Sequence, residues 1–185
     1  MIIRLSDCPS QPWKNGLGRT RELAIHPSAT SSEHFAWRVS IAEVDSAAPF
    51  SRFPGIDRQI VLLDGAGFTM QLDGGQVHAL TTPLAPFAFA GELGVEIILA
   101  GGATQDFNLM LRRSEAGGRV IPWLTAGEHR LDPSIVLVYC AHGTIDTSEG
   151  TLRSGDAWRP ESGHVLINLH DGAAALAVRV ETCRP

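Results

Sequence analysis

The chain of 185 residues is poor in the residues that build disulfides and cysteine-based sites. Its three cysteines, Cys8, Cys140 and Cys183, lie far apart, are odd in number and form no CxxC pair. This usage indicates reduced thiols in the cytoplasm and argues against disulfides or a zinc site. No cysteine has a nearby histidine at a spacing that would indicate an activated thiolate, so we do not expect a thiol nucleophile.

Motifs for metals, nucleotides and activated serines are also missing. The seven histidines form no HxH or HExxH, and the chain has no GxSxG, no Walker loop and no GxGxxG after a strand. A metal site in a barrel needs imidazoles at i and i+2 on one strand face, and Arg38 and Ser40 hold the positions that would suit them. We therefore expect no catalytic metal and no cofactor, with the histidines at the surface or in turns.

Long apolar runs and basic runs are absent as well. No stretch is long enough to span a bilayer, and the first residues, Met1 to Arg4, do not read as a signal peptide. The net charge is -5, and no basic run is interleaved with aromatics, which argues against nucleic acid or an anionic membrane as partner. We expect a cytoplasmic protein with no nucleic acid or membrane partner, for which a homodimer is possible.

Helical periodicity is missing too, because no window of eleven or more residues shows a clear helical stripe. Nineteen glycines and eleven prolines indicate many turns between short strands, and hence an all-β fold. We expect strands at 20–25, 35–42, 60–63, 68–72, 76–80, 87–90, 95–99 and 105–112, then a linker at 114–118 and strands at 134–138, 165–169 and 174–181.

A similar order of elements recurs after the linker, with 134–138 resembling 59–63. Repeated short strands of this kind favour two β-barrels or sandwiches packed together, although chance matching of β patterns is the alternative. We place one barrel at 1–113 and the other at 114–185, and an exchange of strands between them stays open. On the closing strand, the inward face is either Leu176, Val178 and Val180 or Ala175, Ala177 and Arg179.

Two strands each carry a pair of polar side chains on one face. The first alternates strictly from Phe35, which places Arg38 and Ser40 together, and the second places Asp106 and Asn108 together. The face with Arg38 is otherwise small residues, which is not the charged mixture of an ordinary solvated face. Our hypothesis is that both pairs point into one pocket, in the first barrel.

Arg38 is the strongest single candidate, because a guanidinium is costly to bury unless it is paired. It would pair with Asp106, with a ligand carboxylate, which suits its planar fork, or with both. A structural ion pair or a solvated arginine is the alternative. Arg58, which follows a Phe-Pro-Gly turn, would add positive charge at the mouth of the pocket or face solvent.

The run Trp13-Lys14-Asn15-Gly16 places a ring, an ammonium group and an amide on a glycine turn. Loops of this composition often line ligand sites, although a turn with its tryptophan in the core is an equal reading. Further on, Phe50 and Phe53 lie in a connection punctuated by prolines and look exposed.

Three runs resemble the HutD/Ves family: WKNGLGRTREL, RVSIAEVDSAAPFSRFPGIDRQIVLLDGAG, and FAGE followed by DFNLMLRR. They cover most of the first two-thirds of the chain, with Leu17 standing where the family tends to carry another glycine. The resemblance implies a bicupin, two cupin barrels in one chain, without the usual metal-binding histidines. It links the HutD type to histidine utilisation, as a sensor of an intermediate such as formylglutamate or urocanate, and the Ves branch to environmental stress.

Carried onto matching positions, the resemblance implies a ligand pocket formed by Trp13, Lys14, Asn15, Arg38, Ser40, Arg58, Asp106 and Asn108. The leading hypothesis is a non-metal protein that binds a small carboxylate metabolite of the formylglutamate, urocanate or formate type. Arg38, with Lys14 or Arg58, would hold the carboxylate, and Asp106 would orient Arg38.

The other pocket residues would have supporting roles. Asn15, Ser40 and Asn108 would bond polar ligand atoms, and Trp13 would wall the site. No enzymatic activity comes with the resemblance, so whether the chain is an enzyme is uncertain, and we expect that it is not.

Two other hypotheses remain. One is a metal-independent isomerase or lyase with Asp106 or Glu22 as general base. The other is a protein-interaction module that meets its partner through Phe50 and Phe53.

Overall fold

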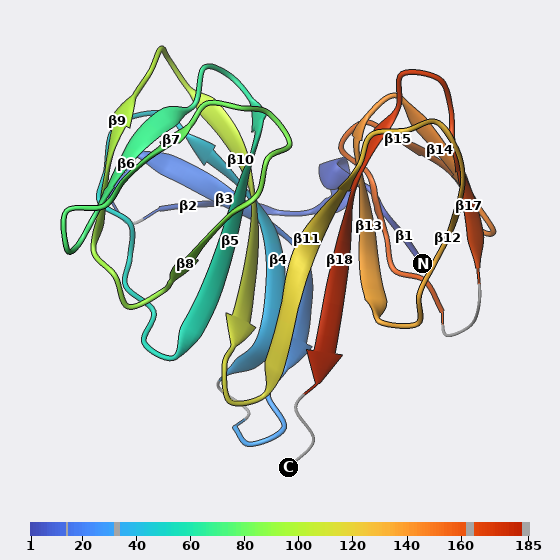
Figure 1. Cartoon of the computed structure of the whole chain (residues 1–185), viewed down its shortest axis with the longest axis horizontal. Helices are drawn as coiled ribbons and strands as arrows, with labels where there is room; N and C mark the ends of the chain where they lie inside the picture. The colour runs from blue at the N-terminus through green and yellow to red at the C-terminus, as the bar shows by residue number, and fades with distance from the viewer. Residues whose placement is uncertain (14, 32–33, 162–164, 183–185) are drawn as a thin grey trace. The chain divides into compact units, whose positions relative to one another are not determined.

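The computed structural model describes residues 1–13, 15–31, 34–161 and 165–182, whose regular secondary structure is β-strand apart from one short 3-10 helix (Figure 1). The chain divides into two compact units, Pro9–Gly117 and a second unit made of Met1–Cys8 with Gly118–Thr182. The predicted all-β class is confirmed. The predicted domain boundary between 113 and 114 stays a prediction, because compact units are defined by contacts and not by independent folding.

The unit Pro9–Gly117 contains two antiparallel sheets. The larger has the order β2 (Ser10–Pro12), β3 (Gly18–Pro27), β4 (Phe35–Val44), β10 (Thr104–Arg112), β5 (Ile56–Asp64), β8 (Phe87–Ala90). The smaller has the order β7 (Val77–Leu80), β6 (Phe68–Leu72), β9 (Val95–Leu99). All of these strands except β2 were expected, because period-two patterns and Gly or Pro turns mark them locally. Strands β3 and β5 are longer than the predicted 20–25 and 60–63.

A hydrophobic core lies between these two sheets. On β6, Phe68 and Met70 point into it and meet Ile60 and Leu62 of β5. The same face of the larger sheet continues from Ile60 into polar side chains, which form the site described below. The opposite face buries Val39, Ile41, Phe107 and Leu109 completely. Burial on both faces explains why the second face of β4 lacks a solvated, charged composition.

The second unit also has two antiparallel sheets. One has the order β1 (Ile2–Ile3), β16 (Ala157–Trp158), β13 (Ile135–His142), β18 (Ala174–Thr182), β11 (Ala116–Trp123). The other has the order β12 (Gly127–Arg130), β17 (Leu166–Leu169), β14 (Thr144–Thr147), β15 (Gly150–Arg153). Its core contains Trp158, Ala175 and Ala177, so the alanine face of β18 is the one that packs within this unit.

Two local features differ from the sequence expectations. The predicted linker at 114–118 is wrong, because only a turn separates β10 from β11 and the strand begins at Ala116. Gly118 belongs to this strand, where a Cβ would lie 2.2 Å from the carbonyl oxygen of Arg179. In addition, a short 3-10 helix, η1 (Leu5–Asp7), forms near the start of the chain.

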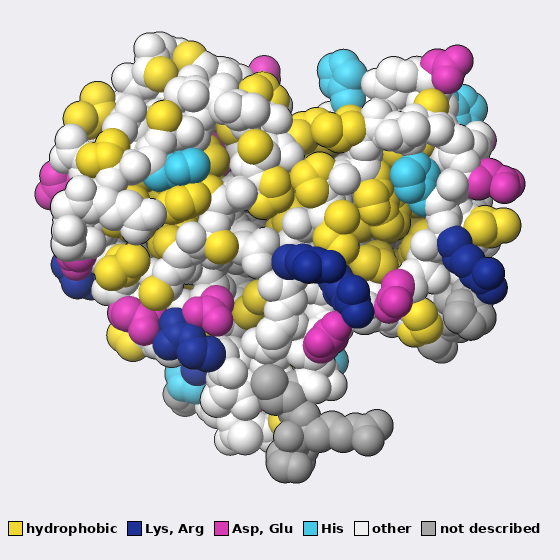
Figure 2. Space-filling view, viewed as in Figure 1, with side chains coloured by type: hydrophobic (Ala, Val, Ile, Leu, Met, Phe, Trp, Pro, Cys, Tyr) yellow, Lys and Arg dark blue, Asp and Glu magenta, His cyan; other side chains and the backbone are white. Residues whose placement is uncertain are grey.

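Charged side chains of both signs lie side by side on the surface (Figure 2). Several form exposed ion pairs, such as Arg113 with Asp57 at 2.7 Å and with Glu92 at 3.1 Å. Such pairs contribute little to stability because both charges remain in water. Within the described ranges, no helix has the length and apolar character needed to cross a bilayer.

Candidate functional site

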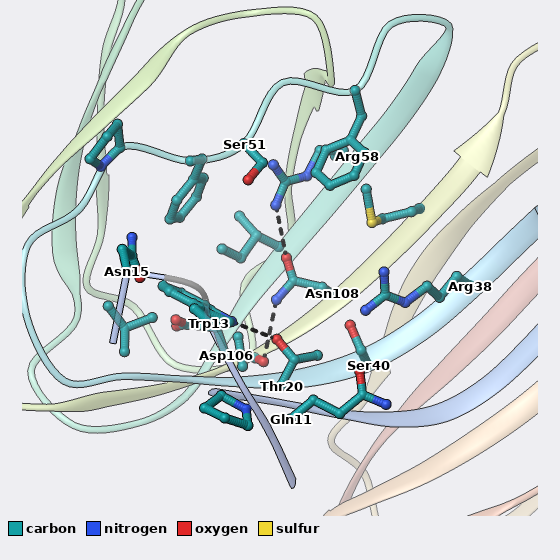
Figure 3. Close-up of a pocket in the computed structure, with 18 residues that line it drawn as sticks. Gln11, Trp13, Asn15, Thr20, Arg38, Ser40, Ser51, Arg58, Asp106 and Asn108 are labelled. Atoms are coloured by element: carbon teal, nitrogen blue, oxygen red, sulfur yellow. Dashed lines mark hydrogen bonds between the residues drawn. The ribbon is translucent and has the colours of Figure 1, made fainter. Parts of the chain in front are cut away.

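A cavity of about 460 Å³ opens in the unit Pro9–Gly117 (Figure 3). Its floor is the face of the six-stranded sheet that carries the polar side chains. Two segments line it from above, through Gln11, Pro12, Trp13 and Asn15, and through Pro49, Phe50, Ser51 and Phe53. Seven of the eight predicted residues line this cavity: Trp13, Asn15, Arg38, Ser40, Arg58, Asp106 and Asn108. The eighth, Lys14, lies outside the described residues.

Strand register explains why these side chains converge. Strand β10 lies between β4 and β5, and Met110 stands opposite both Arg38 and Arg58. One row further along, Asn108 stands opposite Ser40 and Ile60. Residues opposite each other across a sheet point to the same face. The two arginines therefore reach the cavity from strands about 10 Å apart, on either side of Met110.

Arg58 is an almost fully buried cation, only 8% exposed. Its guanidinium lies over the rings of Phe50, Phe53 and Phe89, with centroids at 5.2, 5.6 and 4.9 Å. Its Nη2 donates to Oδ1 of Asn108 at 3.4 Å, and its Nε has no hydrogen-bond partner among the described residues. Burial, and then the charge of Arg38, lower the pKa of Arg58 to about 10, so it remains a cation at neutral pH.

Arg38 is half-buried, and its Nε lies 3.2 Å from Oε2 of Glu22 on β3. The expected pairing of Arg38 with Asp106 is therefore wrong. Asp106 stands opposite Ala42, four residues along β4 from Arg38, which is about 13 Å and beyond the reach of its short side chain. Glu22 stands opposite Ser40, only two residues away. The guanidinium of Arg38 points toward Asn108 (Figure 3).

Asp106 is a fully buried carboxyl group on β10, two residues along the strand from Asn108. Its Oδ2 accepts a hydrogen bond from Oγ1 of Thr104 at 3.2 Å, and its Oδ1 is buried without a partner in the described part of the chain. Burial raises the pKa of Asp106 to about 7, against the smaller opposite effect of the Thr104 hydrogen bond. The side chain of Asn108 donates from Nδ2 to the backbone oxygen of Asp106 at 3.4 Å.

The indole of Trp13 forms part of the upper wall. Its Nε1 donates to Oγ1 of Thr20 at 2.8 Å, which ties this loop to β3. Gly18 leaves room for the ring, because a Cβ there would lie 2.9 Å from it. Asn15 is exposed at the mouth, and its Oδ1 accepts from the backbone N–H of Leu17 at 3.1 Å.

Phe50 and Phe53 form another part of the wall, and the expectation that they are exposed is wrong. Their backbone N–H groups donate to the carbonyl oxygens of Val95 at 2.9 Å and Gly91 at 2.7 Å, which turns the rings inward. Both rings contact Arg58. This placement removes the basis for an interaction module built on these two side chains.

The sequence interpretation missed several lining residues, among them Gln11, Thr20, Ser51 and Met110. Met110 lies on the same face of β10 as Asp106 and Asn108, and Thr20 lies on the same face of β3 as Glu22. Extending the period-two pattern along both strands would therefore have predicted Met110 and Thr20 as lining residues. Gln11 and Ser51 have no local signal. No group of three or more His, Cys, Asp or Glu side chains in the described ranges could hold a metal ion.

Two curated relatives cover most of the chain. An uncharacterized 21.2 kDa protein in the hutC 3' region of Pseudomonas putida is 37% identical over 149 residues, 80% of this chain and 76% of that protein. Protein Ves of Cronobacter sakazakii is 36% identical over 160 residues, 85% of this chain and 86% of that protein.

Two solved structures are similar to this protein over the whole chain. HutD from Pseudomonas fluorescens SBW25 has a TM-score of 0.85 at 28% identity, and a conserved protein of unknown function from Pseudomonas aeruginosa PAO1 has 0.84 at 29%. Each comparison covers 100% of this chain and 99% of the other. Protein Ylba from E. coli, at 9% identity and a TM-score of 0.70 over 100% of this chain and 91% of that one, shows the fold alone.

The predicted cupin-like fold is confirmed by these structures. The sequence profile of the HutD family matches residues 5–177, nearly the full length of the protein. The chain belongs to the HutD family.

Proposed function

We propose that this protein binds a small carboxylate metabolite, without a metal, in the cavity of the unit Pro9–Gly117. The observation that carries the proposal is the pair Arg38 and Arg58, which project from strands on either side of β10 into one cavity. Asn108 lies between the two guanidinium groups (Figure 3).

An anion is the ligand that this pair complements best. The positive charge of Arg38 makes the cationic form of Arg58 less favourable, and a carboxylate between them relieves that repulsion. Arg58 has also lost its water without gaining a partner for Nε. Arginine forms its strongest hydrogen bonds, often two at a time, with carboxylates.

The remaining wall suits a short carbon body. Trp13, Phe50 and Phe53 provide apolar surface opposite the charged floor, and about 460 Å³ is a common size for a small-molecule site. Formate, urocanate and formylglutamate all belong to the class of acids that such a site would take. The HutD structure from P. fluorescens SBW25 is described as a formate condition, so formate is a suitable first probe.

The role we propose is modulation of histidine utilisation or of a stress response by the bound acid. The support is the membership in the HutD family, together with a P. putida relative described by its position in the hutC 3' region.

Titration calorimetry with formylglutamate, urocanate and formate tests this proposal. We expect at least one acid to bind the wild type, and Arg38→Ala to weaken that binding about tenfold or more, because hydrogen bonds to charged groups contribute about 1.5–3 kcal/mol. Arg112→Ala is the matched control, because Arg112 is also half-buried on the same sheet but donates to the backbone oxygen of Phe35. Equal binding by the wild type and Arg38→Ala would reject the proposal.

A second candidate function is a metal-independent proton-transfer enzyme, and the buried Asp106 favours it. A carboxylate whose pKa lies near 7 is suited to act as a general base at neutral pH. Glu22 is a weaker candidate because it is paired with Arg38. Conversion of any of the three acids, followed by NMR and abolished by Asp106→Asn, would establish this function in place of simple binding.

A further inference from the structure

Asp106 has few of the contacts that stabilise a buried carboxylate. Its side chain is completely buried, and Thr104 is its hydrogen-bond donor among the described residues. Oδ1 is enclosed without a partner there. A buried carboxylate needs several donors or a close cation, and otherwise the neutral acid is favoured.

The strands that flank Asp106 supply neither further hydrogen-bond donors nor a close cation for its carboxyl group. It stands opposite Ala42 on β4 and Leu62 on β5, which have no polar side-chain atoms. Arg38 and Arg58 lie further along these strands, where Glu22 and Asn108 contact them. The charges on the loops around the cavity include Arg52, which pairs outward with Asp73 at 3.0 Å, while the structure does not describe Lys14.

We infer that the cavity binds its carboxylate ligand together with one proton, and that Asp106 is the group that takes this proton up. The inference rests on the proposed function, since it needs an anion in the cavity. An anion held by Arg38 and Arg58 adds a second negative charge near Asp106, which disfavours its ionised form. The protonated side chain can instead donate its O–H to the ligand, so the proton moves from solvent to an Asp106 oxygen as the ligand enters.

The affinity for a carboxylate then depends on pH in a defined direction. Burial raises the pKa of free Asp106 to about 7, so above this pH the free protein must gain a proton in order to bind. Between about pH 6 and pH 8 the affinity falls by up to about tenfold. Below about pH 6 Asp106 is already protonated, and this dependence disappears while the ligand itself stays ionised.

Calorimetry in two buffers of different ionisation enthalpy measures the proton directly. The probes are formate, formylglutamate and urocanate, titrated into the full chain at about pH 7.5 and about pH 5.5. We expect uptake of half a proton or more per ligand at the higher pH and close to none at the lower. Asp106→Asn, which imitates the neutral acid, should bind without proton uptake at either pH.

Glu22→Gln is the control for the other carboxylate near the cavity, and we expect it to retain the uptake at about pH 7.5. Loss of uptake in Glu22→Gln, or its persistence in Asp106→Asn, assigns the proton to another group and overturns the inference. Binding by the wild type without uptake at about pH 7.5 overturns the inference alone. Absence of binding by all three acids overturns the proposed function as well. If Asp106→Asn does not fold, absence of uptake by the wild type at about pH 7.5, or its loss in Glu22→Gln, still overturns the inference.

Discussion

Burial of the Arg58 guanidinium is unfavourable for folding, although we propose that the same group binds the ligand. Its replacement should therefore weaken binding without lowering the free energy of unfolding. Removing a buried, partly unsatisfied cation in favour of an apolar side chain of similar length is often neutral or stabilising. We expect Arg58→Met to leave the free energy of unfolding unchanged or to raise it by about 1 kcal/mol in urea denaturation. Carboxylate binding should fall about tenfold or more.

The contrary outcome for Arg58→Met is also informative. A loss of more than about 2 kcal/mol would mean that the contacts with Phe50, Phe53, Phe89 and Asn108 outweigh the desolvation of the guanidinium.

Asp106 should make stability depend on pH. Its folded pKa of about 7 lies above the unfolded value of about 3.9, so its contribution is fully present below the unfolded pKa and is lost as pH rises through about 7. Relative to Asp106→Asn, the wild type should lose about 1–3 kcal/mol of unfolding free energy between about pH 5 and pH 8. Urea denaturation of both proteins at the two pH values measures this, and parallel pH dependences would contradict it.

Much of the site was predictable from residues alone, because the period of two along a strand is strict. It placed Arg38 with Ser40, and Asp106 with Asn108, on shared faces before any strand order was known. The partner of Arg38 was not predictable in this way. It depends on β3 lying beside β4 with Glu22 opposite Ser40, which is a matter of long-range register.

The turn between β5 and β6 depends on a glycine that no other residue replaces easily. Gly67 has a φ of +75°, and a Cβ there would lie 2.0 Å from the carbonyl oxygen of Leu80. Gly74 has a similar φ of +84° but no atom within 4 Å of its Cβ position. We expect Gly74→Ala to cost about 1 kcal/mol and Gly67→Ala about 3 kcal/mol or more, measured by thermal and urea unfolding.

Equal costs for these two substitutions would mean that the turn shifts to relieve the contact with Leu80. The pair isolates the contact, because the strain of a positive φ is common to both positions.

Strand β11 shows where prediction of elements from the sequence stops. Two consecutive glycines suggested a linker, since glycine usually punctuates turns. In the structure Gly118 lies within a strand, because the backbone of β18 at Arg179 approaches too closely for a side chain. A close approach of this kind is a tertiary feature, and the local sequence does not record it. The prediction that Phe50 and Phe53 are exposed was wrong for the same reason. The path of their segment over the sheet depends on tertiary contacts and not on the local sequence.

Across the whole molecule, the first residues belong with the second unit. Strand β1 pairs with β16, and Arg4 forms an ion pair with Asp156, whose Oδ2 also accepts from the backbone N–H of Arg153. The repeated strand order in the two halves of the sequence suggested two barrels. A weak internal repeat does not show, however, that the first residues of the chain pack with the second unit. The pairing of β1 with β16 and the contact of Arg4 with Asp156 assign Met1–Cys8 to the second unit.

Loss of the Arg4 contact should therefore act on the second unit. Asp156 is 8% exposed, so removal of its cation leaves a poorly solvated charge, and we expect Arg4→Ala to cost about 1–2 kcal/mol. Hydrogen exchange should accelerate in β13, β16 and β18 and stay unchanged in β4 and β10, with carboxylate binding retained. Arg52→Ala, which breaks an exposed pair with Asp73, should cost about 0.5 kcal/mol or less. Equal effects of the two variants would contradict this assignment.

A crystal structure of the protein grown with formate tests the central claim most directly. The account predicts a carboxylate between Arg38 and Arg58, with its oxygens within hydrogen-bond distance of both guanidinium groups and of Asn108. Density for formate only outside this cavity, or water alone between the two arginines at a concentration that saturates binding in solution, would contradict it.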